Sequence, residues 1–273
     1  MDLVNGFLNH KMNIEQKCRV ASGANIQLSS EVKKRYNQFV DGLEFPHDGT
    51  GTAGTSVDLL NQYLDYAKEI EKSHTFFNWR SNFAGSIVPE FYYRYLSSRF
   101  SDLKINPHFS TKESVVEATF SVSESGGMDV RRKDQDLSVG LRRETLRING
   151  SDVPFVVPVV CCEMKTNIDI NKLNGLDFSA ERLKRSFPGA TYFLITETID
   201  FSLSNNYAAG YIDEIFVLRK QVRSAARRSK EPLQADVIQE SVEEIVETVV
   251  SAAKVSGHVY DRLKSGRLIQ IQS

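Results

Sequence analysis

The sequence predicts an α/β protein with a mixed central sheet flanked by helices and with helical additions at both ends of the chain. Between Ser114 and Thr196 the patterns indicate strand, strand, strand, helix and strand, an order that places the last strand parallel to an earlier one. Before and after this part, apolar residues recur at the three-to-four spacing of amphipathic helices. We expect one domain with its core in residues 76–218, a helical region in residues 1–75, and a basic stretch and terminal helix in residues 219–273.

The charge balance and the cysteines exclude several classes of protein. The 273 residues hold 34 Lys and Arg against 35 Asp and Glu, so the chain is no polycation and any contact with a polyanion must be local. Cys18, Cys161 and Cys162 are too few and too badly spaced for a disulfide framework or a zinc knuckle. The apolar run Val153–Cys162 is too short for a membrane helix, and Met1–Lys11 lacks the apolar stretch of a signal peptide. We expect a cytoplasmic protein with no membrane partner.

Helical spacing dominates the first third of the chain. The apolar positions in Val32–Val40 and Val57–Ala67 predict two helices, and those in Phe83–Phe100 predict a third, with Glu90 near its middle. The glycine- and threonine-rich segment Asp48–Thr55 lacks the Lys-Ser/Thr ending of a nucleotide-binding loop. We interpret it as a plain loop.

The period changes to that of strands after Ser114. Up to Lys165 the residues alternate or are β-branched, and the pairs Gly126-Gly127 and Asn149-Gly150 predict turns between strands. The later elements are then predicted in order: a helix over Leu173–Phe187, a strand over Ala190–Thr196, a strand over Tyr211–Leu218 and an acidic amphipathic helix over Asp236–Lys254.

Three charged residues on two of these strands could do chemistry. Glu163 and Lys165 are two positions apart, so they project together from an otherwise apolar strand, where charges tend to be kept for a metal or a reaction. Asp136 lies 27 positions upstream, and antiparallel return of the hairpin would bring it next to Glu163. Two carboxylates from adjacent strands suit Mg²⁺, and a lysine beside them would orient the attacking water or help to deprotonate it.

At these residues the chain resembles the PD-(D/E)XK nuclease fold of type II restriction endonucleases. The matching pattern is Asp136 followed by Glu163-x-Lys165, although Gln135 stands where the motif's name has proline. The resemblance implies a restriction-endonuclease-like sheet in which Asp136, Glu163 and the Met164 backbone carbonyl hold Mg²⁺ and Lys165 serves the attacking water. Many members of this fold place a further glutamate on a helix before the hairpin, and Glu90 matches that position in order.

Three segments are similar, more narrowly, to subunits of BbvCI-like restriction endonucleases: FAGSIVPEFYYRYL, RRKDQDLSVG and CCEMK. Such enzymes pair two related subunits, each of which cuts one strand of an asymmetric site. The resemblance extends over much of Phe76–Thr198 and implies an Mg²⁺-dependent endonuclease that hydrolyses double-stranded DNA at a specific sequence. Its partner would be a second related subunit or a second copy, and residues 1–75 are the candidate part for DNA recognition or dimerisation.

Other interpretations stay open at this point. A repair or junction nuclease of the same fold, or a non-catalytic DNA-binding subunit, fits the same motif. Glu163 and Lys165 would form a solvated ion pair if their strand were at an edge of the sheet.

Several charged residues also have alternative interpretations. Asp129 and Asp134 compete with Asp136 as the metal ligand. The basic stretch Arg219–Lys230 is either a solvated helix face or a stripe that contacts DNA phosphates, and Arg131, Arg132, Lys133, Arg142 and Arg143 form a second basic cluster around the candidate ligand Asp136. The acidic helix Asp236–Lys254 either packs on its own domain or contacts a second subunit.

Overall fold

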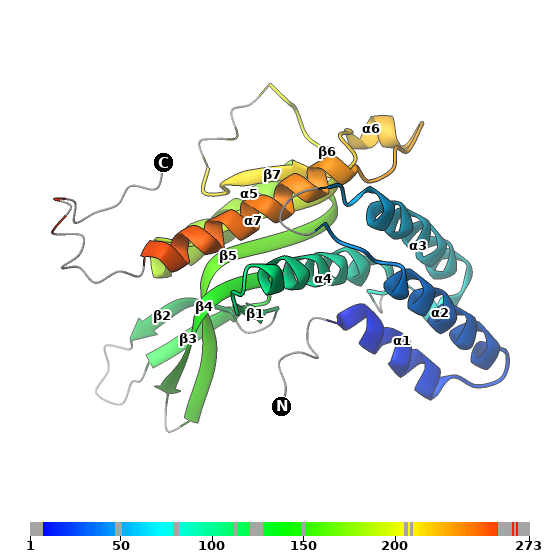
Figure 1. Cartoon of the computed structure of the whole chain (residues 1–273), viewed down its shortest axis with the longest axis horizontal. Helices are drawn as coiled ribbons and strands as arrows, with labels where there is room; N and C mark the ends of the chain where they lie inside the picture. The colour runs from blue at the N-terminus through cyan, green and yellow to red at the C-terminus, as the bar shows by residue number, and fades with distance from the viewer. Residues whose placement is uncertain are drawn as a thin grey trace.

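A five-stranded mixed sheet lies between helices in the computed structural model of the chain (Figure 1). The predicted α/β class is confirmed. The structure describes residues 8–46, 51–78, 82–111, 114–120, 128–148, 151–204, 207, 210–255, 264 and 266. Within that part of the chain, no helix is both long enough and apolar enough to cross a membrane.

The predicted N-terminal helices are present, with one more ahead of them. The helical elements are α1 (Asn9–Val20), α2 (Ala24–Asp41), α3 (Gly54–Ser73), η2 (Thr75–Phe77), η4 (Ala84–Ser86) and α4 (Ile87–Asp102). The predicted loop Asp48–Thr55 is partly wrong, because α3 already begins at Gly54. Residues 48–50 of that segment lie outside the described residues.

The sheet combines an antiparallel half with a parallel half. Its strands, in spatial order, are β1 (His108–Ser110), β4 (Leu137–Ile148), β5 (Ser151–Asp169), β6 (Thr191–Asp200) and β7 (Glu214–Val217). The pairs β1–β4 and β4–β5 are antiparallel, and the pairs β5–β6 and β6–β7 are parallel. Helix α5 (Ile170–Ser186) links β5 to β6, which confirms the predicted crossover.

A separate two-stranded ribbon consists of β2 (Ser114–Phe120) and β3 (Met128–Lys133). The predicted turn residues Gly126-Gly127 and Asn149-Gly150 lie outside the described residues, as do the side chains of Arg131, Arg132 and Lys133. The backbone nevertheless pairs β4 with β5 up to Ile148 and Ser151, on either side of the second predicted turn.

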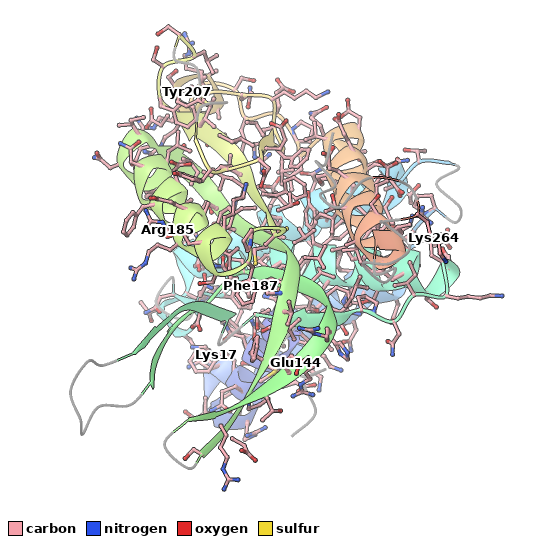
Figure 2. The ribbon with its side chains drawn as sticks, turned by 90° about the vertical axis from the view of Figure 1, so that its left-hand side faces the viewer. Lys17, Glu144, Arg185, Phe187, Tyr207 and Lys264 are labelled. Carbon is pink, nitrogen blue, oxygen red and sulfur yellow. The ribbon has the colours of Figure 1, made fainter. Side chains whose placement is uncertain are left out.

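The two faces of the sheet bury different helices. Cys161 and Leu194 pack with Leu183 of α5, whereas Cys162 and Phe193 face the opposite side, which α4 and α7 (Ala235–Val255) cover. Figure 2 shows α5 and α7 on opposite sides of the strands. Because successive side chains of a strand point to opposite faces, burial on both sides explains the continuous apolar run before Glu163.

Helix α7 packs on its own domain. Val242, Ile245 and Val249 belong to the same core as the N-terminal helices and the sheet. On the polar side of α7, Arg99 Nε of α4 donates to Glu243 Oε1 at 2.7 Å. The simpler of the two interpretations of this acidic helix is therefore confirmed.

A close approach of β4 and β5 requires glycine at position 140. The strand register shifts on both sides of Gly140, and a Cβ atom there would lie 2.1 Å from the Val157 carbonyl oxygen and 2.5 Å from Val156 Cγ1. We expect Gly140→Ala to lower the free energy of unfolding by about 1–3 kcal/mol, because backbone must move to admit the methyl group. Urea denaturation of the full chain measures this change.

Gly175 in α5 provides the matched control. A Cβ atom there would meet nothing within 4 Å. Since alanine is the better helix former, Gly175→Ala should raise the free energy of unfolding by about 0.5–1 kcal/mol. Equal urea midpoints for the two variants would contradict the argument.

Candidate active site

The candidate site lies where β5 extends beyond Leu137, the first residue of β4. The last antiparallel pair is Leu137 with Cys162, and continuing this register by one residue places Asp136 opposite Glu163. From there β5 runs on to Asp169 with β6 hydrogen-bonded to it on one side and no described strand hydrogen-bonded to it on the other. This geometry confirms the expected proximity of Asp136 and Glu163 and leaves one edge of β5 open.

Asp136, Glu163 and Lys165 converge at this open edge. Lys165 Nζ lies 2.8 Å from Glu163 Oε1 and 2.9 Å from Asp136 Oδ2. Burial disfavours the ammonium form, but the Asp136 and Glu163 carboxylates outweigh burial and raise the pKa of Lys165 above its ordinary value. The Glu163 side chain is only 9% exposed, so Glu163 and Lys165 do not form the solvated ion pair that an edge position would give.

The Met164 backbone belongs to the same cluster. Its N–H donates to Asp136 Oδ2 at 2.7 Å, so it points towards the open edge. In an extended strand the N–H and C=O of one residue point to the same side, and the Met164 carbonyl therefore faces this edge as well. Two carboxylates and one carbonyl oxygen are thus directed to one place.

This donor set fits Mg²⁺. Among the described residues, no group of three or more His, Cys, Asp and Glu side chains is placed to hold a metal. Mg²⁺ needs no such group, because it is usually bound through one or two carboxylates and keeps several waters. The single Lys165 ammonium already shared by Asp136 and Glu163 indicates that both carboxylates can face one cation.

A cleft opens beside the cluster, between the open edge of β5 and the start of α4. Asp136, Lys165 and Thr166 line it from the sheet, and Gly85 and Pro89 line it from the helical side. A ligand in this cleft would contact Asp136 and Lys165 directly.

Glu90 does not join this cluster. Its Oε1 accepts hydrogen bonds from the Tyr36 hydroxyl at 2.5 Å and Arg94 Nη2 at 3.0 Å, and its Oε2 accepts one from the Lys11 backbone at 3.0 Å. The residue is buried, and the cleft is lined by its neighbours Val88 and Pro89 instead. The structure thus places Glu90 where α1 and α2 meet α4, because its side chain points into the helical layer.

The structure places the other candidate side chains as follows. Asp136 contacts Lys165, whereas Asp134 is exposed and the Asp129 side chain lies outside the described residues. Cys161 and Cys162 are fully buried, and burial raises the pKa of the Cys162 thiol well above its ordinary value. Both cysteines are therefore core residues.

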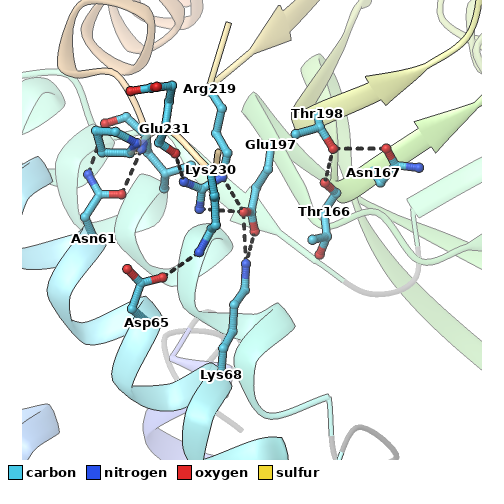
Figure 3. Close-up of polar contacts among 12 residues, drawn as sticks. Asn61, Asp65, Lys68, Thr166, Asn167, Glu197, Thr198, Arg219, Lys230 and Glu231 are labelled. Carbon is cyan, nitrogen blue, oxygen red and sulfur yellow. Dashed lines mark hydrogen bonds and ion pairs between the residues drawn. The ribbon is translucent and has the colours of Figure 1, made fainter. Parts of the chain in front are cut away.

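Sequence reasoning missed a second buried charge cluster at the cleft (Figure 3). Glu197 of β6 lines the cleft and accepts hydrogen bonds from Lys68 Nζ at 2.7 Å and from Arg219 Nη2 at 2.8 Å. Burial outweighs the attraction of Glu197 and lowers the pKa of Lys68. A carboxylate two positions after the apolar run Tyr192–Ile195 was the available signal, similar to the one that singled out Glu163.

The comparisons with known proteins agree with this geometry. Residues 85–265 match the Bpu10I restriction endonuclease family. The chain belongs to this family. A chain of a solved structure described as "native BbvCI A2B2 tetramer at low resolution" is 42% identical to it, with a TM-score of 0.72 over 93% of this chain and 98% of that chain. A search of the curated proteins gave no match.

Membership of the Bpu10I restriction endonuclease family makes the chain a site-specific deoxyribonuclease that acts on DNA. The resemblance to restriction endonucleases seen in the sequence is confirmed. The two alternatives, a structure-specific repair nuclease and a non-catalytic DNA-binding subunit, gain no support from these matches.

Proposed function

We propose that the chain is one subunit of a Mg²⁺-dependent type II restriction endonuclease and that it hydrolyses one strand of its double-stranded DNA site. The observation that carries this proposal is the sharing of the Lys165 ammonium by Asp136 and Glu163 at an open strand edge beside a cleft. Membership of the family supports the reaction, and the cluster supports the residues that perform it.

Asp136, Glu163 and the Met164 carbonyl are the proposed Mg²⁺ ligands. A bound Mg²⁺ would act as a Lewis acid and stabilise the negative charge that develops on the phosphate. The Asp136 carboxylate has a second task, because it also holds the Met164 N–H and so fixes the end of β4 against β5.

Lys165 is the proposed residue for the attacking water. Its ammonium is half-buried and held by two carboxylates, which fixes its position next to the cleft. From there it donates a hydrogen bond that orients the water for in-line attack on the phosphodiester. Its charge also stabilises the additional negative charge of the transition state.

Glu90 acts in this proposal as a positioning residue. Its hydrogen bonds to Lys11, Tyr36 and Arg94 hold α1 and α2 against the first turns of α4. The same part of α4 carries Val88 and Pro89, which line the cleft. Glu90 thus affects the shape of the cleft and touches neither the metal nor the substrate.

A second, related subunit is the proposed partner. The solved relative is described as an A2B2 tetramer, which contains two kinds of chain. An enzyme with two different subunits reads an asymmetric site, whereas a symmetric homodimer would read a palindrome.

Cleavage of plasmid DNA by the full chain, alone and together with the product of the neighbouring gene, tests the proposal. Nicks and double-strand breaks are scored separately with Mg²⁺, with Ca²⁺ and with EDTA. We expect discrete double-strand breaks only with Mg²⁺ and both chains, and nicks in one strand when the partner is inactivated. Cleavage that continues in EDTA, or scattered ends, would contradict the proposal.

A further inference from the structure

The chain between β7 and α7 folds into a closed loop, residues 219–233, which we name the strap. Its two ends meet where the Gln234 N–H donates to the Leu218 carbonyl at 2.7 Å. Asn61 of α3 holds the far end through two hydrogen bonds, accepting from the Leu233 N–H at 2.8 Å and donating to the Leu233 carbonyl at 3.0 Å. The strap therefore has a fixed shape and fixed ends, as compact surface loops do.

The strap lies at the end of the sheet where the cleft opens. Leu218, the residue before it, lines the cleft, and Val222 forms a parallel bridge with Ile199 near the end of β6. Figure 1 shows the short helix α6 (Arg223–Ala226) of the strap beside β6 and α3. In open α/β sheets, ligands bind at the carboxyl ends of the parallel strands, which is where the strap lies.

Most of the basic residues of the strap are already neutralised. Only Arg223–Ala226 is helical, so the interpretation of Arg219–Lys230 as a helix face is wrong. Four of its bases pair with acids on other elements: Arg219 with Glu197, Lys220 with Asp236, Arg223 with Asp200 and Lys230 with Asp65. These ion pairs fasten the strap to the sheet, α3 and α7.

Arg227 and Arg228 are the two basic residues of the strap that form no such ion pair with a described acid. Both are exposed. Their backbone is held, because the Arg227 N–H donates to the Arg223 carbonyl at 3.0 Å and the Arg228 N–H to the Ala225 carbonyl at 2.9 Å. Two adjacent positive charges are thus presented from a hydrogen-bonded loop that begins directly after the cleft-lining residue Leu218.

We propose that Arg227 and Arg228 bind phosphates of the DNA backbone next to the cleft. The inference rests on the proposed function, since it requires DNA to occupy the cleft at Asp136 and Lys165. Guanidinium groups form paired, charge-assisted hydrogen bonds with phosphate, and such contacts position a duplex without reading its sequence.

Salt-dependent binding of a random-sequence duplex tests the inference, with Ca²⁺ in place of Mg²⁺ so that cleavage does not interfere. Each phosphate contact contributes about 0.9 to the slope of log K against log salt. We expect the Arg227→Gln/Arg228→Gln chain to bind more weakly and to show a slope smaller by about 2. The urea midpoint should stay unchanged because both side chains are exposed.

The control removes the same amount of charge elsewhere. Lys104, which follows α4, and Arg147 of β4 are also exposed and unpaired by any described acid, and they lie outside the segments considered for DNA contact, so Lys104→Gln/Arg147→Gln changes the net charge equally. The wild-type slope for this control supports the inference, and equal slopes for the two double variants overturn it. Absence of DNA binding by the wild-type chain would instead overturn the proposed function.

Discussion

Replacing Lys165 by alanine should abolish cleavage while DNA binding persists. Asp136 and Glu163 share the Lys165 ammonium, which lies at the cleft. Losing a group that positions the nucleophile and stabilises charge in the transition state costs about 10²- to 10⁴-fold in rate. Single-turnover cleavage of plasmid by the assembled enzyme measures the loss, and Glu163→Gln should cause one of similar size.

Two measurements separate this loss from a failure to fold. Lys172→Ala removes an exposed lysine of α5, whose side chain is 56% exposed, and should cleave at the wild-type rate. The affinity of the Lys165→Ala chain for duplex DNA in Ca²⁺ should remain close to that of the wild type. A Lys165→Ala enzyme that cuts as fast as the Lys172→Ala enzyme would exclude the proposed role.

The largest loss of stability is expected for Glu197→Ala. The side chains of Glu197 and Arg219 are 7% and 3% exposed, and Lys68 approaches the same carboxylate at 2.7 Å. Removing the carboxylate leaves two cations together in a largely buried place, which costs about 3–5 kcal/mol. Urea denaturation should therefore show a much lower midpoint for this variant.

An exposed ion pair of the same chemistry is the comparison. Glu31 pairs with Arg35 on α2, and their side chains are 47% and 58% exposed. Glu31→Ala should change the free energy of unfolding by only about 0–1 kcal/mol, because water solvates the arginine that is left. If both glutamate variants lost the same small amount, the buried cluster would have no special part in stability.

The sequence allowed the strand that carries Glu163 and Lys165 to be predicted because strand geometry is periodic. Alternation placed Glu163 and Lys165 on one face, and a hairpin of the right length brought Asp136 opposite Glu163. The crossover helix followed from the order of elements. These relations are local or depend on one register, so patterns along the chain are sufficient.

Sequence patterns could not predict the direction of the Glu90 side chain or the ion pairs of the strap. The order of elements places Glu90 on the right helix, but the rotation of that helix decides whether the side chain faces the cleft or α2. The six bases of Arg219–Lys230 look alike in sequence, yet four are neutralised by acids that come from distant parts of the chain. Only the packed structure separates these four from Arg227 and Arg228.

The open edge of β5 has a consequence for the behaviour of the protein in solution. An unpaired strand edge offers free N–H and C=O groups to a strand of another molecule, which is a common start of aggregation. Here Asp136 occupies the Met164 N–H, and the Lys165 side chain stands at the same edge. Charged side chains at an edge disfavour such pairing. The residues proposed for catalysis would thus also protect the chain against self-association, and their replacement is expected to reduce solubility as well as activity.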